Sequence, residues 1–296
     1  MIPAEIMEQF KPGLVTSLSP LIRRITAPNA SPMTGPGTNT YLVGHKEVAV
    51  IDPGMDDPEH IQTIVEACDG NLKWILVTHT HPDHSPGSQS LQALTGAPIY
   101  AHRLELQTVR DENFRCDHYL DEGDQIHCDE FTLTCLHTPG HALNHLCYFL
   151  EEEKLLLAGD MVMDGATVVI MPPDGGMTDY LTQIKRLKEM NIEALAPAHG
   201  RIMRPSKTIL QEILDHRQAR ENMVLDALKQ INKPTTIPDI VEIVYQDVPK
   251  HLHKMAGNTV YAILLKLKDD NTVSGEEKEG IWTLIHSSER HSDKND

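Results

Sequence analysis

The stretch Thr78-His79-Thr80-His81-Pro82-Asp83-His84 constrains this chain more than any other, because it places three imidazoles and a carboxylate within six consecutive positions. Residues 72–77, just before it, are apolar and β-prone, which predicts a buried strand. His79 and His81 lie two apart on an extended segment, so their side chains project to the same side and can share one ion. Asp83 and His84 then face a second ion. Imidazole nitrogen and carboxylate oxygen suit zinc, iron or manganese, so the stretch predicts a metal site at a strand end.

Length and composition are typical of a globular protein. The 296 residues can bury a full core and leave room for one large domain and a small one. The five cysteines form no CxxC pair, which predicts reduced core thiols. No apolar run approaches the length that crosses a bilayer, and residues 1–8 lack the basic start and apolar core of a secretory signal. We therefore expect no membrane span and a cytoplasmic location.

The formal net charge of -17 is unevenly distributed, because residues 1–205 carry -14 of it. Two divalent ions would offset only four of those charges. A broad surface for binding polyanions is therefore not expected from net charge, which argues against tight nonspecific binding of nucleic acid.

The elements around the first motif follow from hydrophobic spacing. A strand is predicted over residues 47–51 and a helix over residues 58–68, so a strand-helix-strand unit delivers the histidines. Pro82 lies near the predicted start of a further helix, which ends at Gly96.

Three later candidate ligands also follow predicted strands. Thr138-Pro139-Gly140-His141 follows residues 131–136, Gly159-Asp160 follows residues 155–158, and Pro197-Ala198-His199-Gly200 follows residues 193–196. The glycine in each motif allows backbone angles and close approach that a Cβ would hinder. A solvated histidine-rich loop would not need these partners. The candidate set is His79, His81 and His141 for one ion, Asp83, His84 and His199 for the other, and Asp160 as a bridge between them.

The motifs HxHxDH, TPGH, GD and PAHG, in this order, resemble the metallo-β-lactamase fold. The resemblance implies an α/β (α+β) chain folded as an αββα sandwich, with the metals at one edge of two packed sheets. Secreted lactamases of the antibiotic-resistance type commonly have a cysteine ligand where this chain has Asp160, and they lack an equivalent of His84. Glyoxalase II enzymes share the ligand set but carry a glutathione-binding tail, for which this chain shows no counterpart.

Residues 206–296 predict three helices and a hairpin, which suggests a winged helix after a metal-binding domain at residues 1–205. From Gly37 to its end the chain resembles the lactamase-beta-like 2 group. The tail segments that carry this resemblance are residues 216–221, 244–249 and 258–267. The best-known member of that group is a single-strand RNA endonuclease of mitochondria, and bacterial relatives are often described only as hydrolases.

The expected mechanism uses a hydroxide that bridges two divalent ions, most simply zinc, with iron and manganese as alternatives. Such a water loses its proton near neutral pH, and the ions polarise the scissile bond. Asp83 and His145 are the candidate catalytic side chains. His145 lies four residues after His141, on the same predicted strand face, where it could orient ligands, protonate a leaving group or simply pack beneath the strand. Asp52 and Thr78 are candidates for holding the ligands in place.

Three functions compete for such a site. The first is endonuclease cleavage of single-stranded RNA, which the family resemblance and the basic residues of the predicted helix 249–268 favour. The second is hydrolysis of a small thioester, lactone or β-lactam, which the acidic first part favours. The third is a winged-helix regulator with an inactive metal domain, against which the complete ligand set argues. The expected partners are thus a small ester-type substrate or single-stranded RNA, and no membrane.

Overall fold

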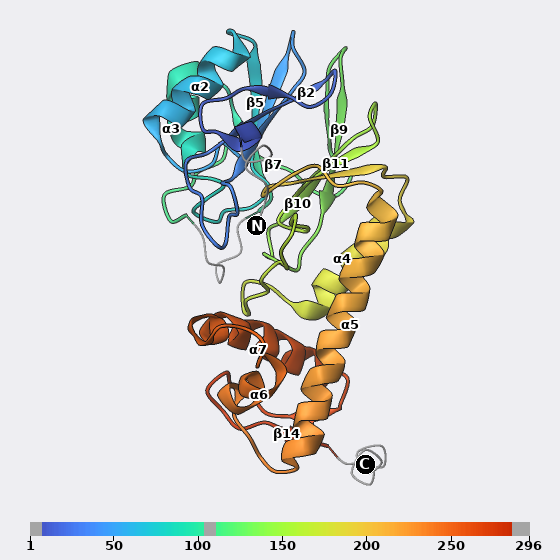
Figure 1. Cartoon of the computed structure of the whole chain (residues 1–296). Coiled ribbons are helices and arrows are strands. Elements are labelled where there is room, and N and C mark those ends of the chain that lie inside the picture. The colour runs from blue at the N-terminus through green and yellow to red at the C-terminus, as the bar shows by residue number, and fades with distance from the viewer. Residues whose placement is uncertain (1–7, 104–110, 286–296) are drawn as a thin grey trace.

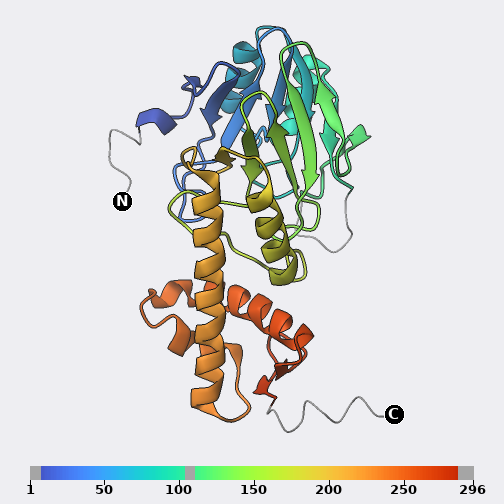
Figure 2. The ribbon, with the colours of Figure 1, turned by 90° about the vertical axis from the view of Figure 1, so that its right-hand side faces the viewer.

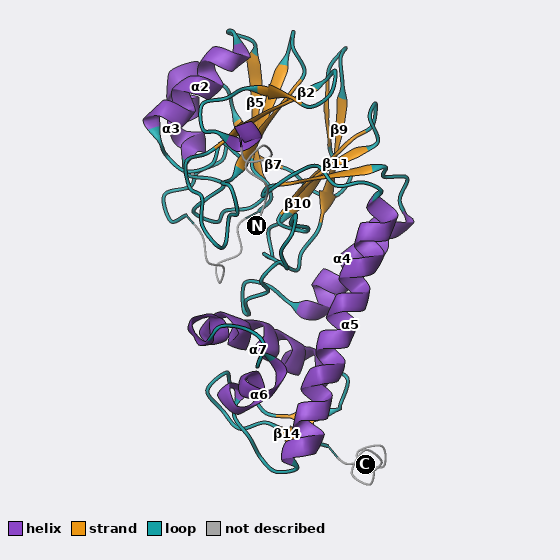
Figure 3. Cartoon of the chain, viewed as in Figure 1, coloured by secondary structure: helices purple, strands orange, loops and turns teal. Residues whose placement is uncertain are grey.

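The computed structural model describes residues 8–103 and 111–285. Two β-sheets face each other and helices cover their outer faces, so the layers follow the predicted αββα order (Figures 1 and 3). The first sheet has seven strands in sequence order: β1 (Thr16–Ser17), β2 (Ile22–Thr26), β3 (Asn39–Val43), β4 (Val48–Ile51), β5 (Leu72–Leu76), β6 (Ile99–Ala101) and β7 (His118–Tyr119).

The second sheet has five strands in the order β12-β11-β10-β9-β8. They are β8 (Gln125–His127), β9 (Thr132–His137), β10 (Leu146–Leu150), β11 (Leu155–Gly159) and β12 (Ala194–Pro197). Apolar side chains from both sheets interdigitate between them, among them Tyr41, Val43, Leu133, Cys135 and Tyr148. All five cysteines are unpaired, as expected.

The outer helices follow local sequence signals. In α2 (Pro58–Cys68) the carboxylate of Asp57 accepts a hydrogen bond from the His60 amide, and Pro58 occupies the first turn, where its missing N–H costs nothing. The helix α3 (Gly87–Thr95) ends at Gly96 as predicted. Its expected start near Pro82 was wrong, because the amides of His84 and Ser85 bond back to the His81 carbonyl in a tight turn. Both helices pack on the first sheet. A short 3-10 helix, η1 (Glu8–Phe10), precedes β1.

The second sheet is covered by α4 (Met177–Glu189) and leads into the C-terminal elements. These are α5 (Ser206–Ile231), α6 (Ile237–Val244), η2 (Lys250–Leu252), α7 (His253–Asp269), β13 (Val273–Ser274) and β14 (Thr283–Leu284). Three helices and a small hairpin make up the predicted winged helix. The single helix expected over residues 249–268 is divided, since η2 forms its first turn.

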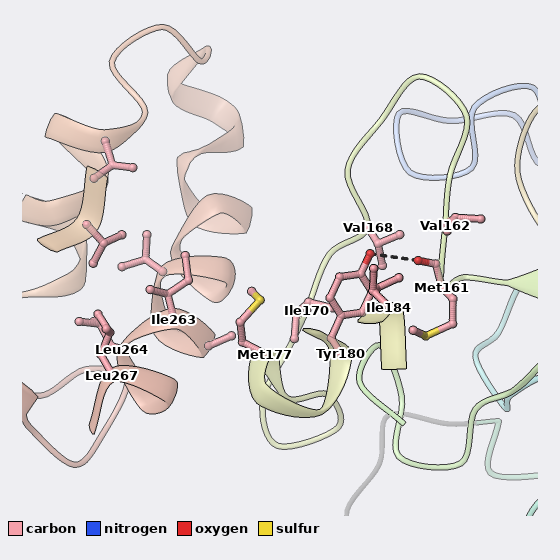
Figure 4. Close-up of a cluster of buried hydrophobic side chains, with 14 of the residues drawn as sticks. Met161, Val162, Val168, Ile170, Met177, Tyr180, Ile184, Ile263, Leu264 and Leu267 are labelled. Atoms are coloured by element: carbon pink, nitrogen blue, oxygen red, sulfur yellow. Dashed lines mark hydrogen bonds between the residues drawn. The ribbon is translucent and has the colours of Figure 1, made fainter. Parts of the chain in front are cut away.

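The long helix α5 connects the sandwich to the winged helix (Figure 2). One hydrophobic cluster joins the two parts, because Met177 and Ile184 of α4 belong to the same cluster as Ile263 and Leu267 of α7 (Figure 4). The expected division of the chain after residue 205 stays a prediction. In the described part of the chain, every helix is too short or too polar to traverse a lipid bilayer.

Strand direction fixes where functional side chains meet. The parallel pairs β4–β5 and β11–β12 bring carboxyl ends together within each sheet. Two backbone hydrogen bonds then join the sheets at this edge: the Leu146 amide donates to the Thr78 carbonyl at 2.7 Å, and the Asn39 amide donates to the Ala198 carbonyl at 2.7 Å. The loops after β4, β5, β9, β11 and β12 therefore converge on one place.

Candidate metal centre

Three imidazoles from two loops form the first half of the site. His79 and His81 follow β5, and His141 follows β9. Nδ1 of His81 lies 2.9 Å from Nε2 of His79 and 3.0 Å from Nε2 of His141. All three residues are buried, with exposed fractions of 1%, 8% and 7%. Three ring nitrogens thus converge on a single point, which is the arrangement of a tripod for one cation.

The second half of the site contains Asp83, His84 and His199. The Asp83 carboxylate lies 3.5 Å from Nε2 of His84 and 3.4 Å from Nε2 of His199. Asp160 stands between the halves, because its Oδ2 is 3.4 Å from Nε2 of His141 and its Oδ1 is 3.3 Å from Nε2 of His199. The structure therefore brings together all seven side chains that the sequence nominated, with Asp160 in a bridging position. Their assignment as ligands remains a proposal.

Each histidine of the first half is anchored through the nitrogen that faces away from the centre. Nδ1 of His79 lies 3.0 Å from the Thr78 hydroxyl, Nε2 of His81 lies 2.7 Å from the Asp174 carboxylate, and Nδ1 of His141 lies 2.9 Å from the Val169 carbonyl. An acceptor at the outer nitrogen holds the ring proton there. The inner nitrogen is left with a lone pair that can bind a metal.

The second half follows the same rule. Nδ1 of His84 lies 2.8 Å from the Asp52 carboxylate, and Nδ1 of His199 lies 3.4 Å from the Gly37 carbonyl. Within the described residues, Nε2 of His84 and Oδ1 of Asp160 are buried and have no hydrogen-bond partner. Buried polar atoms normally have partners, so two such atoms at the centre of the cluster fit the binding of a cation there. The donor set of imidazoles and carboxylates fits a divalent metal.

Charge differs between the two halves. Burial, reinforced by the neighbouring imidazoles, lowers the pKa of His79 well below its usual range, and burial lowers the pKa of His141 to about 4. These rings are neutral at physiological pH, as metal ligands must be. Burial also disfavours charge on His84, but the nearby carboxylates of Asp83 and Asp52 outweigh it and raise the pKa of that ring. The carboxylate half therefore attracts positive charge, which a metal would supply in place of protons.

Asp52 and Thr78 lie where the sequence suggested. The Asp52 carboxylate accepts hydrogen bonds from the Thr78 amide and hydroxyl, both at 2.7 Å, and also holds His84. One buried carboxylate thus fixes the start and the end of the first motif.

Asp174 was not anticipated from the sequence. It is 1% exposed and lies in the turn Pro172-Pro173-Asp174-Gly175-Gly176, which packs on the His141 loop through a bond from the Gly176 amide to the Gly140 carbonyl. An aspartate followed by two glycines is a common turn, and the sequence carries no signal that this one meets His81, 93 residues away.

His145 lies behind the metal centre and outside the cleft. It was expected on one strand face with His141, which was wrong because residues 138–145 form a turn before β10. Its Nε2 accepts a hydrogen bond from the Asp160 amide at 3.1 Å, and its Nδ1 lies 2.9 Å from the Thr138 hydroxyl. Burial lowers the pKa of this ring well below its usual range. With both nitrogens engaged, His145 is placed to position Asp160 and not to protonate a leaving group.

Gly159 makes that contact possible. It adopts a positive φ of 49°, and a Cβ on it would lie 2.5 Å from Nε2 of His145. The GD motif therefore needs glycine so that the turn can reach the imidazole.

We expect His145→Ala to weaken metal binding about 10- to 100-fold, the range typical of residues that orient ligands, because the Asp160 amide loses its acceptor. Competition with a chromogenic chelator measures this affinity. His127→Ala, at an exposed position of β8, is the control. Unchanged metal affinity together with a lost acidic or basic limb in the rate-against-pH profile would instead support proton transfer.

A cleft of about 800 Å³ opens from the metal centre toward the winged helix. His81, Asp83, His141, Asp160 and His199 line one end of it. The remaining walls are mainly apolar and come from residues 32–34, the 163–171 segment, α5 and the C-terminal elements. They include Met33, Met163, Val168, Val169, Met171, Val248, Leu252, Met255 and Ala256. A substrate at the metals would therefore touch both parts of the chain.

An αββα sandwich with this histidine and aspartate cluster at its edge defines a metal-dependent hydrolase. Residues 33–199 match the Metallo-beta-lactamase superfamily, and residues 236–282 match the Beta-lactamase associated winged helix domain. The chain belongs to the metallo-beta-lactamase superfamily, as its motifs suggested.

Named relatives span nearly the whole chain. "Beta-lactamase-like protein 2 homolog" of Caenorhabditis elegans is 29% identical over 291 residues, which cover 95% of this chain and 96% of that protein. "Atrochrysone carboxyl ACP thioesterase" of Aspergillus chevalieri is 30% identical over 285 residues, which cover 92% of this chain and 89% of that protein. A metallo-beta-lactamase family protein from Thermus thermophilus has a similar fold, with a TM-score of 0.75 at 21% identity, over 91% of this chain and 100% of that one.

Proposed function

We propose that this protein is a dinuclear metal-dependent hydrolase of a thioester or another small ester, with zinc as the expected metal. The observation that carries the proposal is the cleft of about 800 Å³, in which the metal centre forms one end and apolar side chains form most of the walls. A volume of this order suits a small organic ligand. The similarity to the protein named "Atrochrysone carboxyl ACP thioesterase" supports the same substrate class.

The residues of the chain have separable roles in this reaction. Divalent ions, when bound, supply a water that is acidic enough to act as the nucleophile near neutral pH. His79, His81 and His141 would hold one ion, Asp83, His84 and His199 would hold the other, and Asp160 would contribute to both. Asp83 lines the cleft and has a side chain that is 30% exposed, so it is placed to accept a proton from the attacking water. The apolar walls exclude bulk water from the reacting group.

Cleavage of single-stranded RNA is the second candidate. One observation favours it: Lys250, His251 and Lys254 are exposed and alternate with Leu252 and Met255, which line the cleft. Another cation of the same region is neutralised, since Lys266 pairs with Glu221 at 3.0 Å and with Asp270 at 2.9 Å. The sequence placed RNA slightly ahead of a small ester. The size and apolar lining of the cleft reverse that order.

A substrate panel on metal-loaded protein separates the two candidates. We expect hydrolysis of acyl thioesters, which is measured by the release of the free thiol. The rate should change little between low and moderate salt. A nuclease would instead cut unstructured RNA, with activity falling steeply as salt rises because protein cations displace counterions from phosphate. RNA cleavage with that salt dependence, and no turnover of any ester, would overturn the proposal.

A further inference from the structure

Two arginines of α5, Arg217 and Arg220, line the same cleft as the metal ligands. Apart from Asp83 and Asp160 at the metal centre, no carboxylate lines this cleft in the described part of the chain. His216 also lines this cleft, but burial lowers the pKa of its imidazole, so the two guanidiniums supply the positive charge there. In a chain with a formal net charge of -17, the wall away from the metals is thus locally positive.

Arg217 is held in place without being neutralised. It is only 3% exposed, its guanidinium lies over the Tyr180 ring at 5.1 Å, and its Nη2 donates to the Val168 carbonyl. Its Nε is buried and, among the described residues, has no hydrogen-bond partner. A buried donor on a full positive charge is costly to leave without an acceptor, so this nitrogen points to a ligand.

Arg220 lies one turn further along α5 and is anchored in the same manner. Its Nη1 donates to the Val244 carbonyl at 3.0 Å, and its guanidinium lies 4.4 Å from the centroid of the Tyr245 ring. Within residues 8–103 and 111–285, the arginines that form ion pairs are Arg186 and Arg201. Glu221, the next residue on the helix, pairs with Lys266. Two adjacent cations therefore line the cleft, and among the described residues they contact backbone carbonyls and tyrosine side chains and pair with no carboxylate.

We propose that Arg217 and Arg220 form a subsite that binds a carboxylate or phosphate group of the ester substrate, away from the bond that is cleaved. The inference rests on the proposed esterase function and adds the chemistry of the substrate to it. A guanidinium offers five N–H donors in a planar fork that matches both anions, and each of these arginines uses only one of them on the protein backbone. The apolar residues that line the same cleft fit an uncharged portion of the substrate between its anionic end and the bond that is cleaved. The substrate is therefore an ester with an apolar acyl or thiol part and one anionic end.

The test compares three thioesters of one chain length with metal-loaded protein. The first is a neutral N-acetylcysteamine thioester, the second is the coenzyme A thioester of the same acyl group, and the third is an N-acetylcysteamine thioester that ends in a free carboxylate. We expect Arg220→Gln to lower kcat/KM for an anionic substrate roughly 10- to 100-fold relative to the neutral one, as the loss of a charge-assisted hydrogen bond predicts. Arg220→Lys should restore part of the ratio, because the charge returns without the planar fork.

The pattern of losses identifies the source of the anion. A loss confined to the coenzyme A thioester indicates phosphate on the thiol side, and a loss confined to the third compound indicates carboxylate on the acyl side. Lys207→Gln, at an exposed position of α5 outside the cleft, is the matched control and should leave all ratios unchanged. An equal fall for all three substrates, or no fall, overturns the subsite alone. Inactivity of the unaltered protein toward all three overturns the esterase function and the subsite together.

Discussion

Asp160→Asn is expected to abolish most hydrolysis, by about 10³-fold or more, and to reduce the bound metal from nearly two equivalents per chain. The two carboxylate oxygens of Asp160 lie near ring nitrogens of opposite halves of the site, at 3.4 Å from His141 and 3.3 Å from His199. An asparagine keeps the shape but has one oxygen and no charge, so it can serve only one half. Metal ions stabilise charge in the transition state by several kcal/mol, and the loss of that stabilisation slows the reaction by about 10³-fold or more.

Elemental analysis of protein purified without chelator measures the occupancy, and steady-state hydrolysis measures the rate. Asp179→Asn makes the same chemical change at an exposed position in the first turn of α4 and should leave both unchanged. If the unaltered protein holds no more than one equivalent after metal is added, the dinuclear proposal fails. Full occupancy in Asp160→Asn would show that this carboxylate is not the bridge.

The ligand cluster could be predicted from the sequence because its members share one kind of position. His79, His141, Asp160 and His199 each follow a strand rich in buried residues, and chain direction within the sheets sends those strand ends to the same edge. Local capping signals similarly place α2 within its predicted bounds. These features depend on hydrophobic periodicity and on the positions of glycine and proline, which are visible in a single sequence.

The partners that hold the ligands could not be predicted in the same way. Asp174 meets His81 only after α4 and the turn before it have packed on the second sheet, and the acceptors for His141 and His199 are backbone carbonyls, which no residue type reveals. His145 was assigned to a strand face because spacing alone does not show the turn at Ala142. The position of α7 near the cleft depends on how the long helix α5 packs against α4. The sequence alone does not show which surfaces of these helices meet.

Asp52→Asn is expected to weaken metal binding in the second half of the site about 10- to 100-fold, as residues that orient ligands typically do. Oδ1 of Asp52 accepts from the Thr78 amide, while Oδ2 accepts from the Thr78 hydroxyl and lies 2.8 Å from Nδ1 of His84. If the asparagine oxygen keeps the bond to the Thr78 amide, its NH2 group faces His84. The ring then favours the tautomer with its proton on Nε2, the nitrogen that faces the metal.

Asp174→Asn provides the contrast, because it makes the same change behind His81 in the first half of the site. The two variants should therefore release different ions during a chelator titration: Asp52→Asn should lose the ion held by His84, and Asp174→Asn the ion held by His81. In cobalt-substituted protein, the paramagnetically shifted NMR signals of the ligand histidines report which ion is lost first. Identical titrations in the two variants would show that these carboxylates stabilise the loops as a unit and do not tune separate ligands.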